Sequence, residues 1–105
     1  MISISRLDYR PVSLRATADL LQALGHPIRL QIVDALRPAR RTVTEIVEAL
    51  GLEQPVVSKH LSVLRDAGVV SARTQGRERV YELAPRRLDP LLGALFTPNK
   101  RGTAS

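Results

Sequence analysis

The chain has 105 residues, 44% apolar but only 3% aromatic, which is enough for one modest core of aliphatic side chains. The formal charge of +6 comes almost entirely from arginine and favours a nucleic acid, an anionic membrane or an acidic protein as partner, although a genome-wide arginine bias would give the same excess. Because cysteine is absent, disulfides, thiolate metal sites and thiol redox switches are excluded. No apolar run could span a bilayer and no signal-peptide pattern is present, so we expect a soluble, cytoplasmic protein.

The pattern along the chain predicts one domain between two segments without clear periodicity. Residues 1–12 are predicted to form an N-terminal arm, and residues 97–105, rich in polar residues, glycine and proline, a flexible tail. The domain between them, residues 13–96, begins with two segments of helical spacing, 13–24 and 27–37.

Gly25, His26 and Pro27 separate these two helices. The glycine is expected to cap the C-terminus of the first helix, and the proline suits the first turn of the second. His26 is predicted to be a capping residue in this turn rather than a ligand. The second helix is predicted to end at the basic, proline-containing stretch 37–41.

A third and a fourth helix follow, joined by a tight glycine turn. Thr42 and Glu45 form a capping-box pattern that opens a short helix ending at Leu50, and Gly51 makes the turn. The next helix is predicted over residues 53–67. Two short helices joined in this way indicate a helix-turn-helix, whose second helix can enter the major groove of DNA.

The hydrophobic period then changes from that of a helix to that of a strand. Residues 69–75 and 78–83 have the pattern of two strands around the turn Gly76-Arg77, which predicts a hairpin. Beyond it, leucines recur in a last helix ending near residue 96, and they make an apolar stripe that one small domain could hardly bury alone. The predicted fold class is mainly α with a small β-hairpin wing, a dimeric winged helix-turn-helix of about five helices and two strands.

The fourth helix has an apolar and a polar side. The stripe predicted to face the core consists of Val57, Leu61 and Leu64. The polar side carries Gln54, Ser58 and Lys59, which suit base edges and phosphates in a major groove. A solvated helix face would look the same in isolation, but the adjoining turn and basic hairpin favour DNA. His60 falls inside the apolar arc, so a partly buried histidine bonded to backbone stays open beside a DNA contact.

Arginines also recur in the predicted hairpin. Arg73, Arg77 and Arg79 alternate with smaller residues, which places Arg77 at or near the tip and predicts a basic exposed face. Such a wing could follow phosphates or insert an arginine into a narrow minor groove, although a hairpin kept soluble by arginine would have the same pattern. Arg40 and Arg41 lie beside the start of the third helix, whose amides would also favour a phosphate.

Three stretches of this sequence are similar to motifs of the ArsR/SmtB-type bacterial repressors. LLQALGHPIRL at 20–30 resembles the opening signature of that family, VVSKHLSVLRDAGVV at 56–70 its recognition helix and first wing strand, and GRERVYEL at 76–83 its wing and second strand. The resemblance covers about residues 14–95. It implies a dimeric winged-helix repressor whose first and last helices form the dimer interface. A palindromic promoter site with half-sites about one helical turn apart would follow from the two-fold symmetry.

The resemblance also implies DNA contacts from the fourth helix and the wing. Together with residues beside the third helix, the predicted DNA-binding residues are Arg41, Thr42, Gln54, Val57, Ser58, Lys59, His60, Arg73, Gln75, Arg77 and Arg79. The predicted dimer-interface residues are Leu14, Leu20, Leu21, Leu88, Leu91, Leu92 and Leu95.

The chain departs from the metal-sensing members of the family. Where those proteins place a cysteine pair on the third helix, residues 41–47 have no thiol, and the predicted last helix carries Asp89 but no histidine. We therefore expect no metal site and no cofactor. Regulation by an organic small molecule, by a partner protein, or by the abundance of the protein alone stays open.

Other functional classes fit the sequence less well. No nucleophile–base pair, phosphate-binding glycine loop or pair of catalytic carboxylates is evident, so we expect no enzyme. A winged-helix module that binds a protein instead of DNA is the alternative, but such an interface would favour aromatics, and the chain has only Tyr9, Tyr81 and Phe96. A membrane-surface protein would need a basic amphipathic helix with bulky apolar anchors, which the sequence lacks.

Overall fold

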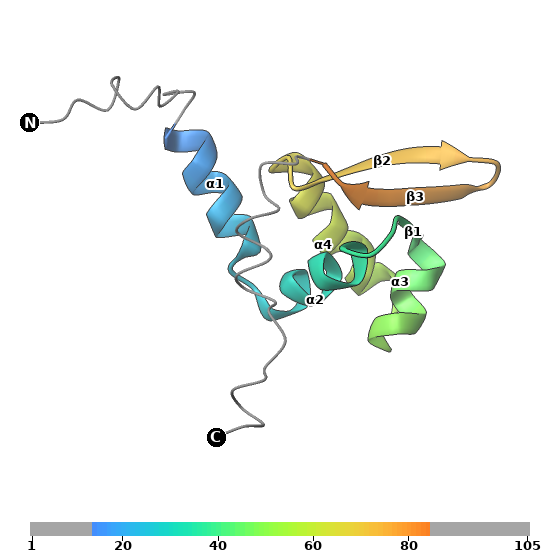
Figure 1. The fold of residues 1–105 in the computed structure, drawn as a ribbon. Helices are drawn as coiled ribbons and strands as arrows, with labels where there is room; N and C mark the ends of the chain where they lie inside the picture. The colour runs from blue at the N-terminus through green and yellow to red at the C-terminus, as the bar shows by residue number, and fades with distance from the viewer. Residues whose placement is uncertain (1–13, 85–105) are drawn as a thin grey trace, which may run out of the picture.

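The structure, a computed structural model, describes residues 14–84, which form four helices and three strands (Figure 1). In chain order these elements are α1 (Leu14–Leu24), α2 (Pro27–Leu36), β1 (Arg41–Thr42), α3 (Val43–Leu50), α4 (Gln54–Asp66), β2 (Val70–Gln75) and β3 (Glu78–Leu83). Each predicted helix and strand in this range begins and ends within one residue of its observed bounds. The predicted arm, the last helix with Leu88, Leu91, Leu92 and Leu95, and the predicted tail lie outside the described residues.

The turn between α1 and α2 confirms the predicted role of His26. The Nδ1 atom of His26 accepts a hydrogen bond from the Ile28 amide at 3.1 Å, so the imidazole caps α2 while Pro27 occupies its first turn. Gly25 directly follows α1, and its amide donates to the Gln22 carbonyl of that helix at 3.1 Å without a left-handed backbone conformation.

The predicted capping box at the start of α3 is present. The Thr42 hydroxyl accepts from the Glu45 amide at 3.1 Å, and the Thr42 amide donates to the Glu45 carboxylate at 2.8 Å. Gly51 then ends α3 with a φ of 69°, a left-handed conformation that side chains with a Cβ rarely adopt. The turn therefore directs the chain into α4 without a longer loop.

The three strands form one antiparallel sheet in the order β1-β3-β2. β2 and β3 are the predicted hairpin, paired from Val70 opposite Leu83 to Gln75 opposite Glu78. The two-residue strand β1 was not predicted; it pairs with β3 and holds Arg41 opposite Tyr81. β1 thereby ties the start of α3 to the base of the hairpin, which extends beyond the helices in Figure 1.

The core is almost entirely aliphatic, and α4 contributes three of the seven side chains that are fully buried within residues 14–84. The fully buried side chains are Ile32, Val33, Ile46, Val57, Leu61, Leu64 and Val69. α4 contacts α1, α2, α3 and β2, so its orientation is set from several sides. Within residues 14–84, no helix is both long and apolar enough to cross a membrane.

The predicted interface residues of α1 divide into two kinds. Leu14 and Leu21 are 73% and 51% exposed, so their side chains are available to a second subunit. Leu20 is only 7% exposed because it packs into the core of its own chain, so its assignment to a dimer interface was wrong.

Candidate DNA-binding surface

A groove of about 270 Å³ lies where the first turns of α3 and α4 meet the hairpin. It is lined by Thr42, Val43, Thr44, Gln54, Ser58, Arg77, Glu78, Arg79 and Tyr81. The groove therefore brings together three segments that are far apart in the sequence. Every lining residue except Val43 carries a polar or charged group able to form hydrogen bonds, and Arg77 and Arg79 can also form salt bridges with phosphates.

The N-terminal half of α4 presents the predicted reading face. Gln54 and Ser58 are exposed and line the groove, and Lys59 is exposed beside them. Val57, in contrast, is 0% exposed and belongs to the core. Its assignment to the DNA-binding set was wrong, because a side chain on the apolar stripe of the helix cannot also reach a groove on the polar side.

The start of α3 adds two threonines to the lining of the groove. Thr42 and Thr44 both line it, although the Thr42 hydroxyl is already used in the capping box. Arg41 is half-buried, and its Nε atom donates to the Ala35 carbonyl at 2.6 Å. The side chain of Arg41 therefore satisfies a backbone carbonyl in the last turn of α2, a role that the sequence pattern did not indicate.

The hairpin carries its arginines differently from the prediction. Gly76, with a φ of 67°, and Arg77 form the turn, so Arg77 stands at the tip as expected. Arg73 lies opposite Val80 and Arg79 lies opposite Thr74, which are consecutive positions of the ladder. Since successive side chains of a strand point to opposite faces, Arg73 and Arg79 do not share a face, and the expectation of a single basic face was wrong.

Only part of the predicted wing therefore lines the groove. Arg77 and Arg79 do, whereas Arg73 and Gln75 are exposed but do not line it. The guanidinium of Arg79 lies 5.7 Å from the centre of the Tyr81 ring, a cation–π contact that holds it over the strand. Tyr81 and Thr44 were missed as lining residues; the alternation of β3 hinted at Tyr81, but only the pairing with β1 brings it beside α3.

His60 lies on the side of α4 that faces α2. Its ring centre is 4.5 Å from that of His26, with the rings tilted by 48°. The Nδ1 atom of His60 is buried without a hydrogen-bond partner, so the predicted alternative of a bond to backbone is not made at this atom. Burial, and then the nearby His26, Arg29 and Lys59, lower the pKa of the His60 imidazole below its ordinary value of 6.5.

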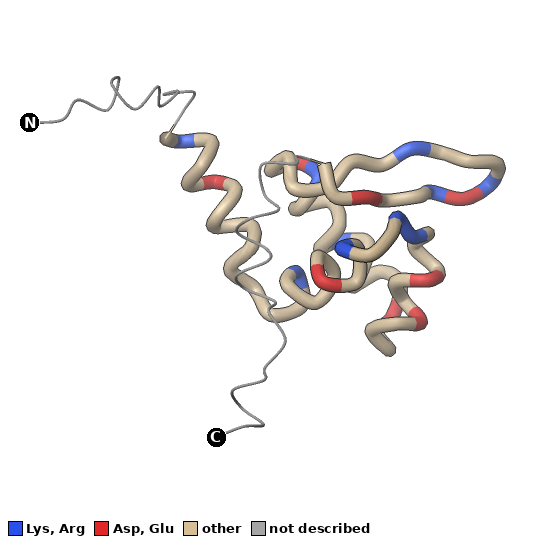
Figure 2. Tube along the Cα trace, viewed as in Figure 1, with Lys and Arg blue, Asp and Glu red and all other residues tan. Residues whose placement is uncertain are grey.

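Basic side chains gather near the groove. Figure 2, in which the backbone trace is coloured by residue type, shows arginine positions along the hairpin and beside the start of α3, with acidic positions between them. No group of three or more histidine and carboxylate side chains able to hold a metal ion occurs among residues 14–84. The surface thus has the donors and the positive charge that phosphate and base edges require.

The comparisons with known proteins agree with this geometry. The family model described as "Bacterial regulatory protein, arsR family" matches residues 26–72. The chain is 48% identical over 75 residues to the HTH-type transcriptional repressor SmtB of Mycobacterium tuberculosis (strain CDC 1551 / Oshkosh), and this match covers 71% of the chain and 56% of the relative. It is 33% identical to the biofilm growth-associated repressor of Xylella fastidiosa (strain 9a5c), with 92% of each chain covered. The chain belongs to the ArsR family of bacterial regulatory proteins.

A solved structure supports the fold of this ArsR-family chain. The homodimeric winged helix-turn-helix DNA-binding domain Mb0332 from Mycobacterium bovis has a TM-score of 0.74 and 27% identity, covering 90% of this chain and 83% of that one. The described helices and the β2–β3 hairpin are thus those of a winged helix-turn-helix, with α4 as the second helix of the motif and the hairpin as its wing.

Proposed function

We propose that this protein is a homodimeric transcriptional repressor that binds a palindromic promoter site in the cytoplasm. The groove carries the proposal, because it sets Gln54 and Ser58 of α4 beside Arg77 and Arg79 of the wing. In that arrangement α4 enters the major groove and reads base edges, while the wing contacts the phosphates that flank it. The named repressors among its relatives support a repressor rather than an activator.

The dimer follows from the exposed side of α1 and from the homodimeric neighbour. Leu14 and Leu21 present an apolar edge that a second subunit would cover. Two copies related by a two-fold axis would place their α4 helices in successive major grooves, which explains the proposed palindrome. Contacts from the predicted last helix would extend this interface.

DNA binding is tested by fluorescence anisotropy with a labelled duplex from the promoter region upstream of the protein's own gene and with a scrambled duplex. We expect tight binding to the first duplex, weaker binding to the second, and a steep loss of affinity for both as salt is raised. Binding that does not depend on salt, or none at low salt, would favour the protein-interaction module instead.

The dimer is tested by sedimentation of the Leu21→Glu variant. A carboxylate on the exposed edge of α1 should not be tolerated in an apolar interface, so we expect monomers and weaker promoter binding. Gln22→Glu adds the same charge to an exposed neighbouring position of α1 and serves as the control. A Leu21→Glu dimer as stable as the control would contradict the assignment.

A further inference from the structure

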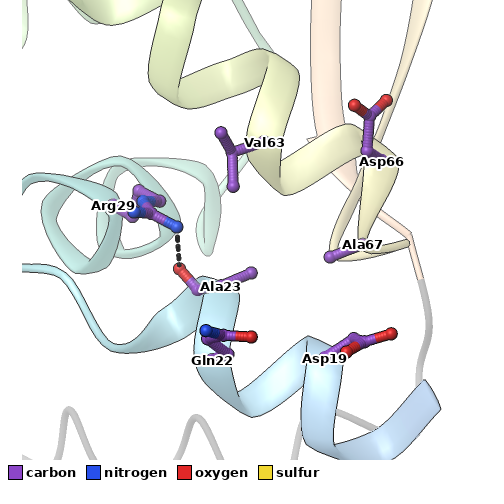
Figure 3. A pocket seen from close by; sticks show the side chains of 7 residues that line it. All are labelled: Asp19, Gln22, Ala23, Arg29, Val63, Asp66 and Ala67. Carbon is purple, nitrogen blue, oxygen red and sulfur yellow. Dashed lines mark hydrogen bonds between the residues drawn. The ribbon is translucent and has the colours of Figure 1, made fainter. Parts of the chain in front are cut away.

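The first turn of α2 joins the helix at the proposed dimer edge to the helix at the proposed DNA surface. Arg29 of this turn donates from Nη1 to the Ala23 carbonyl of α1 at 3.2 Å, across a groove of about 430 Å³ (Figure 3). His26, the N-cap of the same turn, lies against His60 of α4 with 4.5 Å between ring centres. The chain contains two histidines, and both are in this contact.

A proton on the Nδ1 atom of either ring would disturb this contact. The Nδ1 atom of His26 accepts the Ile28 amide proton at 3.1 Å, so it has no proton of its own. A proton added there would place two N–H groups against each other and remove the cap of α2. The Nδ1 atom of His60 is buried without a partner, so a proton at that atom would have no acceptor.

The charges around the pair also oppose protonation. Arg29 of α2 and Lys59 of α4 lie close enough to disfavour a positive His60, and the burial of the ring adds to their effect. Asp19 of α1 and Asp66 of α4 line the neighbouring groove, as Figure 3 shows, but in the described part of the chain neither forms an ion pair with Arg29. A second positive charge on His26 would repel a protonated His60 at this distance.

We propose that His26 and His60 form a proton-sensitive joint between α2 and the DNA-reading helix α4, and that acidification weakens DNA binding by loosening this joint. The proposal rests on the proposed DNA-binding function. It makes His60 a positioning residue, since its ring contacts His26 at the start of α2.

The direction of the effect separates this role from a direct DNA contact. A histidine facing phosphate would gain a positive charge on acidification and would bind DNA more tightly at low pH. The joint predicts the reverse. The folded state lowers the pKa of His60 below 6.5. The stability that depends on a neutral His60 is therefore fully present above pH 6.5 and is lost as the pH falls through the lowered pKa.

The test is the pH dependence of promoter affinity in the full-length protein, from about pH 7.5 to about pH 5.5, the range in which histidine titrates. We expect the dissociation constant of the wild type for the labelled promoter duplex to rise about tenfold as the pH falls. His60→Phe keeps a ring against His26 and cannot take up a proton, so its curve should be much flatter. His26→Asn is the matched variant at the other ring, because asparagine also caps a helix but removes the imidazole that contacts His60.

Two further readouts keep the outcomes distinct. Side-chain NMR of the free wild type should show His60 titrating below pH 6.5. The free energy of unfolding, measured with denaturant, should fall on acidification more in the wild type than in His60→Phe. Equal pH slopes in the wild type and His60→Phe, or tighter binding at low pH, would overturn the joint. If no duplex is bound at any pH, the proposed function fails, and with it the proposed effect of acid on DNA binding. If the free energy of unfolding depends on pH equally in the wild type and in His60→Phe, the joint itself is rejected.

Discussion

The helix α4 and the β2–β3 hairpin both border the groove, but they are held in different ways. α4 buries Val57, Leu61 and Leu64 completely, and it contacts three helices and a strand. The hairpin is anchored at its base by Val70, Val80 and Tyr81, while its residues 73–79 are exposed. The position of α4 is therefore fixed by side-chain packing, whereas the reach of the wing depends on its backbone ladder and its turn.

This difference indicates which substitutions alter the fold and which alter only binding. A change at a buried residue of α4 should lower both stability and DNA binding, because the core holds the DNA-reading face of the helix in place. A change at the tip of the hairpin should act on binding alone. Three variants test this division, beginning with the largest expected effect.

Leu61→Ala should lower the free energy of unfolding by about 2–5 kcal/mol, because it leaves a cavity at a fully buried position. Urea denaturation followed by circular dichroism measures this loss. Lys59→Ala, two residues away on the exposed side, should change stability by less than about 0.5 kcal/mol. Similar midpoints for the two variants would show that the packing of α4 does not hold the fold as described.

Gln54→Ala should reduce discrimination between the promoter and the scrambled duplex by about 1–3 kcal/mol, because the amide is placed to pair with a base edge. Its unfolding curve should match the wild type, since the side chain is exposed. Gln22→Ala removes the same side chain from α1, outside this groove, and should leave the discrimination unchanged. An equal loss in both glutamine variants would remove Gln54 from the reading face.

Arg77→Ala should weaken binding to every duplex modestly and reduce the slope of log affinity against log salt by about 1, because one phosphate contact is lost. Arg15→Ala deletes an equal charge from α1 and is the control. An unchanged slope in Arg77→Ala would refute the wing contact. A lower free energy of unfolding in Arg77→Ala would show that the tip of the hairpin contributes to stability as well as to binding.

Local signals in the sequence were sufficient for most of the fold. The period of apolar residues, the capping box at Thr42 and the glycine turns gave each helix within one residue, since these are short-range effects. The cap at His26 was also predictable, because histidine directly precedes a proline that starts a helix.

The errors concern contacts between distant segments. β1 has two residues and no period of its own, so only its pairing with β3 defines it. The same pairing places Tyr81 in the groove. The separation of Arg73 and Arg79 depends on the register of the hairpin, and the contact of His60 with His26 joins residues 34 positions apart. None of these features follows from composition or local periodicity.

The most direct test of the account is the amide NMR spectrum of the protein during titration with the promoter duplex. The account predicts that the strongest changes fall on the residues of the groove, at Thr44, Ser58 and Arg77, with little change at Asp19 and Gln22. Changes centred on Asp19 and Gln22, with α3 and the wing unaffected, would contradict it, because DNA would then lie against the groove between α1, α2 and α4.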